Sequence, residues 1–567
     1  MSEHTFCQLC MERHDEWDEP GFEEHLRARH KRESVEQMYP EDLAARVFDV
    51  DDGGVDAAGD RSTGDSGGTG TETGPGRSET GPGAGTGTGG SVRGTGSRGG
   101  ETEPRTGPAG GTGTDEELRG KKWFVIGVGG AGNHLLDSLL LRRDTLARRD
   151  DPLSVVWEGG LAGYLSLNTN DAEISETYYA KRDLGLSIDE LRTQLVIANR
   201  VYGGKGAGRQ WTVGRDTMQW EFEDDRNPIT DGKWPVREPD IRGAQAVMFV
   251  HSVTKGTGCG ATPVLARELG EMLNDDELLY DKPMLSAVVL PKQTGSRTGE
   301  MIRGVVGTSL LSQWVKGIIP FDNGRLAEHA IGPGTDLPDI DDHDWVPQQY
   351  RERNRVFVKF IESFMLSSVP TTADTSNPVS GDVFDVRDSF GPVLDKYSVD
   401  PDREYQPAVV MAPVVGRSQQ TAFDEDALEL LASSALKQGR LVDCDPATAW
   451  GGTFLVFGPE EAMADVRPLL DDGVLRETLA GEEYLASDRA PGSAAVDVYT
   501  DQLVVPHADS VNLWGLLWNP EIPPLQRMYE YAQQRKDDGT SQGAEALRDV
   551  WHLVEPLFGS LGRENMG

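Results

Sequence analysis

The chain has 567 residues, of which 94 are acidic and 55 basic, so its formal net charge at pH 7 is −39. One hydrophobic core rarely serves so long a chain, and we expect two or three domains. The negative charge argues against nucleic acid and anionic membranes as partners, and it is typical of proteins from a high-salt cytoplasm. The apolar runs fall far short of the roughly 20 residues that cross a bilayer, so no membrane insertion is expected.

The N-terminal region contains a candidate zinc site. Two of the four cysteines, Cys7 and Cys10, are followed after fourteen residues by His25 and then by His30. This spacing is close to that of a two-cysteine, two-histidine zinc site and predicts a zinc-finger-like module over residues 1–35 that binds Zn²⁺. The few cysteines and the lack of a charged-then-apolar leader also predict a cytoplasmic protein.

The segment between the two ligand pairs, ERHDEWDEPGFEE, is strongly acidic. Because contacts with phosphate dominate affinity for DNA, we interpret the module as a docking site for a protein partner. An accidental spacing stays open as the alternative, as does the use of His4 or His14 as a substitute ligand.

Residues 51–116 consist almost entirely of Gly, Thr, Ser, Glu, Asp, Pro and Arg. Such a segment cannot bury enough apolar surface to offset the entropy of ordering it. We therefore predict a disordered linker between the finger-like module and the rest of the chain.

From residue 119 onward, apolar runs alternate with helical patterns. Strands are expected at 122–127, 164–168, 245–250 and 284–290, and helices at 132–141, 187–200 and 262–273. This alternation predicts an α/β fold with a parallel sheet.

The first strand leads into a glycine-rich turn, GVGGAGN, that opens a helix. Free backbone N–H groups and the helix dipole favour a phosphate at such a point. The turn also fits the G-x-G-x-x-G pattern of dinucleotide-binding proteins. That pattern needs an acidic residue about 20 positions later, where this chain has the polar loop ARRDDP, and Asp171 lies much further on. The dinucleotide interpretation is weakened but stays open.

Two further glycine-rich loops follow, GGKGAGRQW at 203–211 and HSVTKGTGCGATP at 251–263. Three such loops in one α/β domain are hard to explain as unrelated turns. Together they predict a site for a nucleoside triphosphate.

These loops, in this order, resemble the tubulin/FtsZ superfamily of GTP-binding filament proteins, in a divergent, archaeal and halophile-like form. The resemblance implies a Rossmann-type GTP-binding domain at 119–345, a long central helix at 346–368 and a second, smaller α/β domain at 369–515. Residues 516–567 look like a helical C-terminal extension without a counterpart in the family.

The resemblance also implies contacts with GTP or GDP, with Mg²⁺ or K⁺ left open as a companion ion. The implied nucleotide-binding residues are Gly129, Gly130, Ala131, Gly132, Asn133, Asn168, Gly206, Ala207, Gly208, Lys255, Gly256, Thr257, Gly258, Cys259, Gly260, Asn323, Tyr350 and Asn354. The last two lie four residues apart, hence on one helix face, and would stack on guanine and bind its edge.

The third loop departs from the family pattern. Thr254 and Lys255 stand where the family has glycines, and Cys259 replaces its small hydroxyl residue. Lys255 could hold phosphate charge directly or point into solvent, and the sequence leaves both open.

Asp382 and Asp385, in SGDVFDVRDSF, match the family's catalytic acids, which reach into the nucleotide pocket of the next subunit. The resemblance thus implies head-to-tail self-assembly and GTP hydrolysis across the interface, although an acidic pair in so acidic a chain could equally be a solvated turn. The family's Glu-to-Arg brace has no clean match in TGSRTGEMIR, where Arg297, Glu300 and Arg303 have no assigned roles. A nucleotide-bound regulator or scaffold that does not polymerise is therefore the alternative, and a dinucleotide-dependent oxidoreductase the third hypothesis.

Overall fold

The chain divides into two units, residues 1–105 and 106–567, and the computed structural model describes residues of the second only. The described residues are 123–151, 153–178, 197, 203–223, 226–274, 282–291, 298–331, 340, 348–367, 407–420, 422–481, 497–505, 508–538, 544, 547–548, 550–559 and 561. Three sets of predictions lie outside them: the zinc ligands Cys7, Cys10, His25 and His30, the linker at 51–116, and the acids Asp382 and Asp385.

The described part is built on a nine-stranded sheet with the strand order β2-β1-β3-β4-β5-β6-β9-β7-β8. The strands are β1 (Trp123–Val128), β2 (Leu161–Leu167), β3 (Ala246–Ser252), β4 (Met284–Val289), β5 (Gly317–Phe321), β6 (Val409–Ser418), β7 (Gly451–Gly458), β8 (Asp497–Val504) and β9 (Val511–Trp518). Strands β2 to β6 pair in parallel, β9 is antiparallel to both of its neighbours, and β7 and β8 are parallel. The predicted α/β fold with a mainly parallel sheet is confirmed.

The parallel strands are continuous apolar runs. Every residue of β1, WFVIGV, and of β3, AVMFVHS, is buried. Burial on both faces is what a parallel sheet covered by helices requires. The four predicted strands are observed as β1 to β4 with small shifts at their ends.

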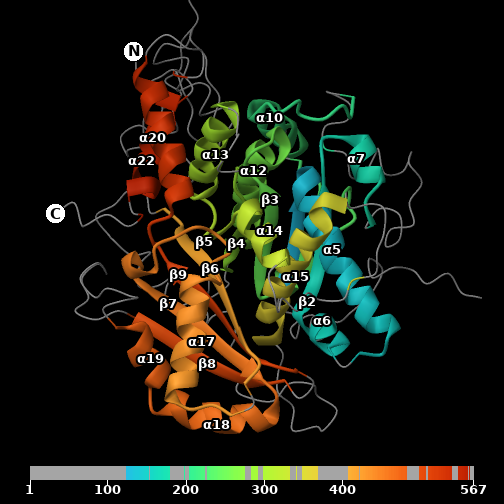
Figure 1. Cartoon of the computed structure of the whole chain (residues 1–567). Coiled ribbons are helices and arrows are strands. Elements are labelled where there is room, and N and C mark those ends of the chain that lie inside the picture. Colours follow the sequence, from blue (N-terminus) through green and yellow to red (C-terminus); the bar gives the residue numbers. More distant parts are fainter. Residues whose placement is uncertain are drawn as a thin grey trace, which may run out of the picture. The chain divides into compact units, whose positions relative to one another are not determined.

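The helices follow the strands along the chain (Figure 1). They are α5 (Gly129–Arg148), α6 (Ser154–Gly160), α7 (Asp171–Ser175), α10 (Trp211–Phe222), α11 (Glu238–Gly243), α12 (Gly256–Asn274), α13 (Thr298–Leu311), α14 (Asn323–Ile331), α15 (Gln348–Ser367), α17 (Glu425–Lys437), the 3₁₀ turn η3 (Pro446–Thr448), α18 (Glu460–Asp471), α19 (Val474–Leu479), α20 (Pro523–Asp537) and α22 (Trp551–Gly559). The helix predicted at 187–200 lies outside the described residues, apart from position 197.

Two predicted helix starts are wrong. The helices expected from 132 and 262 begin at Gly129 and Gly256, inside the glycine-rich motifs. Glycine is a poor helix former, but here the missing Cβ permits close packing that outweighs propensity. A Cβ on Gly132 would lie 2.1 Å from the carbonyl oxygen of Val250, and one on Gly260 would lie 1.9 Å from that of Trp211.

Helix α15 packs against α5 and α6 through a buried ion pair. The Arg142 Nε donates to Glu362 Oε1 at 2.9 Å, and the Trp157 indole donates to the same oxygen at 2.9 Å. The side chains of Arg142 and Glu362 are only 10% and 9% exposed. This contact fixes the long helix beside the helix that opens the first glycine motif.

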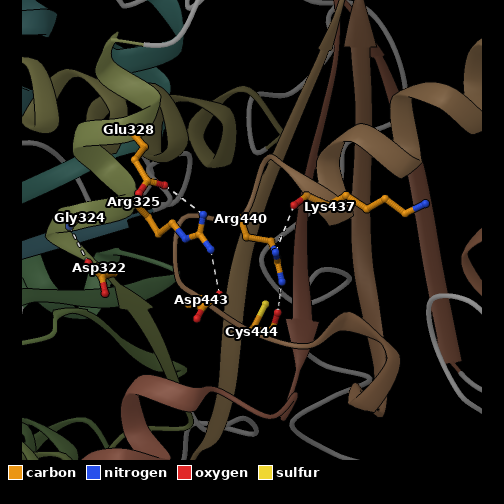
Figure 2. Close-up of polar contacts among 8 residues, drawn as sticks. All are labelled: Asp322, Gly324, Arg325, Glu328, Lys437, Arg440, Asp443 and Cys444. Atoms are coloured by element: carbon orange, nitrogen blue, oxygen red, sulfur yellow. Dashed lines mark hydrogen bonds and ion pairs between the residues drawn. The ribbon is translucent and has the colours of Figure 1, made fainter. Parts of the chain in front are cut away.

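A second polar joint links α14 to the loop after α17 (Figure 2). Arg325 bridges Glu328 of its own helix, at 3.0 Å, and Asp443 of the loop, at 2.9 Å. The Asp322 amide donates to the Leu441 carbonyl at 3.0 Å. The end of β5 is thereby tied to the strands β6 to β9.

The C-terminal segment does not form an extension apart from the sheet. Strand β9 spans the position 515 at which we placed a boundary, and it lies between β6 and β7. Helices α20 and α22 then pack against α13 (Figure 1). No helix within the described ranges is long and apolar enough to cross a membrane.

Glu362→Ala should lower the free energy of unfolding by about 3–5 kcal/mol, because it leaves the Arg142 guanidinium buried without its main partner. Glu328→Ala, which breaks a partly exposed pair, should cost no more than about 1 kcal/mol. Urea denaturation followed by tryptophan fluorescence measures both. Equal costs for the two variants would contradict a stabilising role for the buried pair.

Candidate functional site

A cavity of about 300 Å³ lies at the carboxyl ends of β1, β2 and β3. Ligand sites of open α/β sheets are found at this edge of the strands. The cavity is lined by Val128, Gly129, Gly130, Ala131, Asn168, Asn170, Glu173, Lys205, Gly206, Ala207, Gly208, Arg209, Ser252, Lys255, Gly256, Thr257 and Gly258. All three glycine-rich loops therefore contribute to one cavity.

Two helices begin at this cavity. Helix α5 starts at Gly129 and α12 at Gly256, and neither first turn contains an acidic residue. The first turn of a helix has backbone N–H groups without intrahelical partners, and the helix dipole adds positive charge there. Two such ends at one cavity make it suited to an anion such as a phosphate chain.

The three loops are held together by short contacts. The Thr169 and Thr257 hydroxyls lie 2.6 Å apart, and the Gly206 amide donates to the Thr169 carbonyl at 2.8 Å. A Cβ on Gly129, which has φ +73°, would lie 3.2 Å from the Gly258 nitrogen. A Cβ on Gly256 would lie 2.6 Å from the Gln210 carbonyl oxygen, so the second and third loops are also in close contact.

Eleven of the predicted nucleotide-binding residues line the cavity: Gly129, Gly130, Ala131, Asn168, Gly206, Ala207, Gly208, Lys255, Gly256, Thr257 and Gly258. Gly132, Asn133, Cys259 and Gly260 are not among its lining residues. The Asn133 amide donates to the Leu167 carbonyl at 3.2 Å, which joins α5 to β2. These four positions pack the elements that shape the cavity.

Cys259 illustrates this supporting position. It is 1% exposed, and its thiol donates to the Arg303 carbonyl at 3.2 Å. Burial raises the pKa of the thiol to about 12, so that it is neutral and packs as a small apolar group.

Arg303 is hydrogen-bonded to the backbone of the third loop. Its Nε donates to the Thr254 carbonyl at 2.8 Å, and burial lowers the pKa of its guanidinium. Of the three residues left without roles, Arg303 and Glu300 lie on α13 and Arg297 lies outside the described residues.

The predicted base-binding residues do not line the cavity. Asn354 is 6% exposed, and its amide donates to the His134 carbonyl at 3.2 Å and to the Ser138 hydroxyl at 3.0 Å, both on α5. Tyr350 lies one helical turn earlier, with the Arg353 guanidinium 5.8 Å from its ring centroid. Asn323 is the first residue of α14 and is not among the lining residues either.

His134, whose carbonyl accepts from Asn354, is influenced by two charged residues of the cavity lining. Burial lowers the pKa of its imidazole, with opposing effects from Glu173, which raises it, and Lys255, which lowers it. Both of those charged residues line the cavity.

Six lining residues were not among the predicted binding residues: Val128, Asn170, Glu173, Lys205, Arg209 and Ser252. The two cations stand in the quoted loop GGKGAGR, so the loop itself was the available signal. Glu173 accepts from the Asn168 amide at 3.0 Å, and its carboxylate lies 2.7 Å from where a Cβ of Gly130 would be. Nothing in the local pattern around this residue indicates that contact.

Residues 122–330 match the GTPase domain of the Tubulin/FtsZ family. All three glycine-rich loops lie inside this match. A search of curated proteins finds no match to the chain.

Several solved structures are similar to this chain. CetZ2 from Haloferax volcanii, as a GTPγS-bound protofilament, is 15% identical with a TM-score of 0.50, over 74% of this chain and 100% of that chain. CetZ1 from Haloferax volcanii, as a GDP-bound monomer, is 16% identical with a TM-score of 0.49, over 73% of this chain and 100% of that chain. The empty FtsZ dimer of M. jannaschii is 18% identical with a TM-score of 0.44, over 70% and 88%. Together with the family match, the CetZ2 fold supports the resemblance to the tubulin/FtsZ superfamily.

No group of three or more His, Cys, Asp or Glu side chains suited to a metal ion occurs within the described residues.

Gly260→Ala should lower the free energy of unfolding by about 1–3 kcal/mol, because its Cβ would meet the rigid Trp211 carbonyl at 1.9 Å. Gly270→Ala is the matched control on the same helix. Its Cβ would meet only the flexible Met284 methyl at 3.2 Å, and the gain in helix propensity is up to about 1 kcal/mol. Thermal and urea unfolding measure the difference. A neutral Gly260→Ala would show that α10 and α12 do not pack this closely.

Proposed function

We propose that this protein is a cytoplasmic, GTP-binding, tubulin/FtsZ-like protein that assembles head to tail. One observation carries the proposal: three glycine-rich loops and two helix N-termini converge on one cavity, within the segment that matches the GTPase domain. The phosphates would contact the backbone of the loops beginning at Gly129 and Gly256, and the loop at 203–209 would close over them.

Head-to-tail assembly is supported by the fold shared with CetZ2, which was solved as a GTPγS-bound protofilament. A heterologous contact of this kind yields an open filament. In the proposed filament, Asp382 and Asp385 of one subunit act on the nucleotide of the next. Phosphoryl transfer needs mainly positioning and charge stabilisation, which two carboxylates that orient water would supply.

A nucleotide-bound regulator or scaffold that does not polymerise is the second candidate. Two observations favour it: Cys259 is buried and neutral instead of offering a hydroxyl, and Arg303 holds the loop backbone instead of lining the cavity. The match to a GTPase domain argues against the oxidoreductase hypothesis.

Residues 1–35 are proposed to bind Zn²⁺ through Cys7, Cys10, His25 and His30 and to dock a protein partner. The linker at 51–116 would leave GTP binding and assembly independent of the metal. Zinc analysis of the full chain beside Cys7→Ser tests this, and a parent protein without zinc would contradict it.

Full-length protein should bind GTP and GDP but not NAD, and it should sediment with GTP only. Asp385→Ala should bind GTP and sediment but release no phosphate, because the carboxylate acts on a neighbouring subunit. Pelleting, nucleotide binding and phosphate release are measured on the same samples. Binding of GTP without sedimentation would favour the regulator, and binding of NAD in preference to GTP would favour the oxidoreductase.

Tyr350→Ala should lower GTP affinity about tenfold, which is the loss expected when one base–aromatic stack is removed. Asn354→Ala should lower GTP affinity and also the melting temperature, since Asn354 is hydrogen-bonded to α5. Glu352→Ala, an exposed position between them, is the control and should change neither quantity. Unchanged GTP affinity in both of the first two variants would place the base elsewhere.

A further inference from the structure

The charge of the cavity is opposite to that of the chain. Its lining contains three cations, Lys205, Arg209 and Lys255, and one carboxylate, Glu173. The whole chain carries 94 acidic residues against 55 basic ones. A local excess of positive charge in so acidic a protein requires a reason specific to this place.

In the part of the chain that the structure describes, none of the three cations takes part in a salt bridge, although many other arginines and lysines do. The positive charge of Arg209 lowers the pKa of the Arg303 guanidinium, and that of Lys255 lowers the pKa of the His134 imidazole. All three cations are exposed, so their charged ends are available to a ligand.

Arg209 has an unusual backbone conformation. Its φ is +67°, and the other described non-glycine residues with positive φ are Asp150 and Asn519, which are the types that tolerate this region. The left-handed conformation is strained for an arginine and is not strained for a glycine. The neighbouring positions 206 and 208 are glycines in the same conformation. An arginine kept at such a position indicates that its side chain is needed.

The single carboxylate of the lining is already engaged, because Glu173 accepts from the Asn168 amide at 3.0 Å. Mg²⁺ at a nucleotide site is usually held by one or two carboxylates together with phosphate oxygens. Cations that contact phosphate directly can instead neutralise it, and an arginine can do so with two parallel hydrogen bonds.

We propose that Lys205, Arg209 and Lys255 take the place of a divalent cation on the terminal phosphates, so that the cavity binds a nucleoside triphosphate without requiring Mg²⁺. This inference rests on the proposed GTP-binding function. In this proposal, side chains of two different loops, at 203–209 and at 254–258, neutralise the negative charge of the terminal phosphates. They also give the site a preference for triphosphate over diphosphate, because the diphosphate offers these cations less charge.

The test is GTP and GDP binding to the full-length protein by calorimetry, once with excess EDTA and once with Mg²⁺. The parent should bind GTP with affinities within about threefold of each other under the two conditions. Lys255→Met and Lys205→Met should each lose about tenfold or more in EDTA, the loss expected for a charge-assisted hydrogen bond, and Mg²⁺ should restore part of it. Lys233→Met, which removes a cation outside the cavity, is the control and should bind like the parent.

Arg209→Gly distinguishes a phosphate-binding role of Arg209 from a purely structural one, because the two roles predict different changes in GTP affinity and melting temperature. It should weaken GTP binding in EDTA by about tenfold while raising the melting temperature of the nucleotide-free protein, because it relieves the backbone. A lower melting temperature with unchanged GTP affinity would overturn the assignment of Arg209.

Failure of GTP binding and failure of the cation assignment would give different results. If no GTP binds under either condition, the proposed function itself is wrong. If GTP binds tightly with Mg²⁺ but more than about a hundredfold more weakly in EDTA, and Lys255→Met does not change the Mg²⁺ value, GTP binding stands and the cation assignment is overturned.

Discussion

The site depends on close contact between backbones at positions where only glycine fits. A Cβ on Gly214 would lie 2.4 Å from the Gly256 carbonyl oxygen, and those on Gly132 and Gly260 would meet other carbonyls even more closely. Larger side chains would hold α5, α10 and α12 away from one another and from β3. Because they are absent, two helix N-termini and the loop at 203–209 reach a single cavity. The glycines therefore permit close packing of the helices, and this packing in turn forms the cavity that a ligand would occupy.

The net charge of the chain and the cations of the cavity act on an anionic ligand over different distances. At low ionic strength a net charge of −39 repels an anionic nucleotide over a long distance. At about 1 M salt the Debye length falls to roughly 3 Å, and this repulsion is screened. The proposed contacts of Lys205, Arg209 and Lys255 with phosphate would act within that distance. An acidic surface and a cation-lined cavity are thus compatible at high salt concentration.

The sequence predicted the elements of the site better than their boundaries and partners. Continuous apolar runs identified β1 to β4, and the glycine loops identified most of the lining. The starts of α5 and α12 were placed too late, because helix propensity says nothing of close packing against a carbonyl such as that of Val250. Lys205 and Arg209 were visible in their loop, but only the fold directs that loop to the ends of β1 to β3. Similarly, no local pattern could place β9 between β6 and β7, since that pairing joins segments far apart in sequence.

The C-terminal helices extend this dependence on packing beyond the segment that matches the GTPase domain. A Cβ on Gly304 would lie 2.2 Å from the Met528 methyl, so α20 rests directly on α13. The adjacent residue, Arg303, accepts from the Cys259 thiol and donates to the Thr254 carbonyl. A continuous path of contacts therefore runs from α20 through α13 to the loop that carries Lys255. Because packed interiors transmit small shifts, the position of α20 bears on the geometry of the cavity. Helix α20 therefore supports the candidate site from outside the segment that matches the GTPase domain.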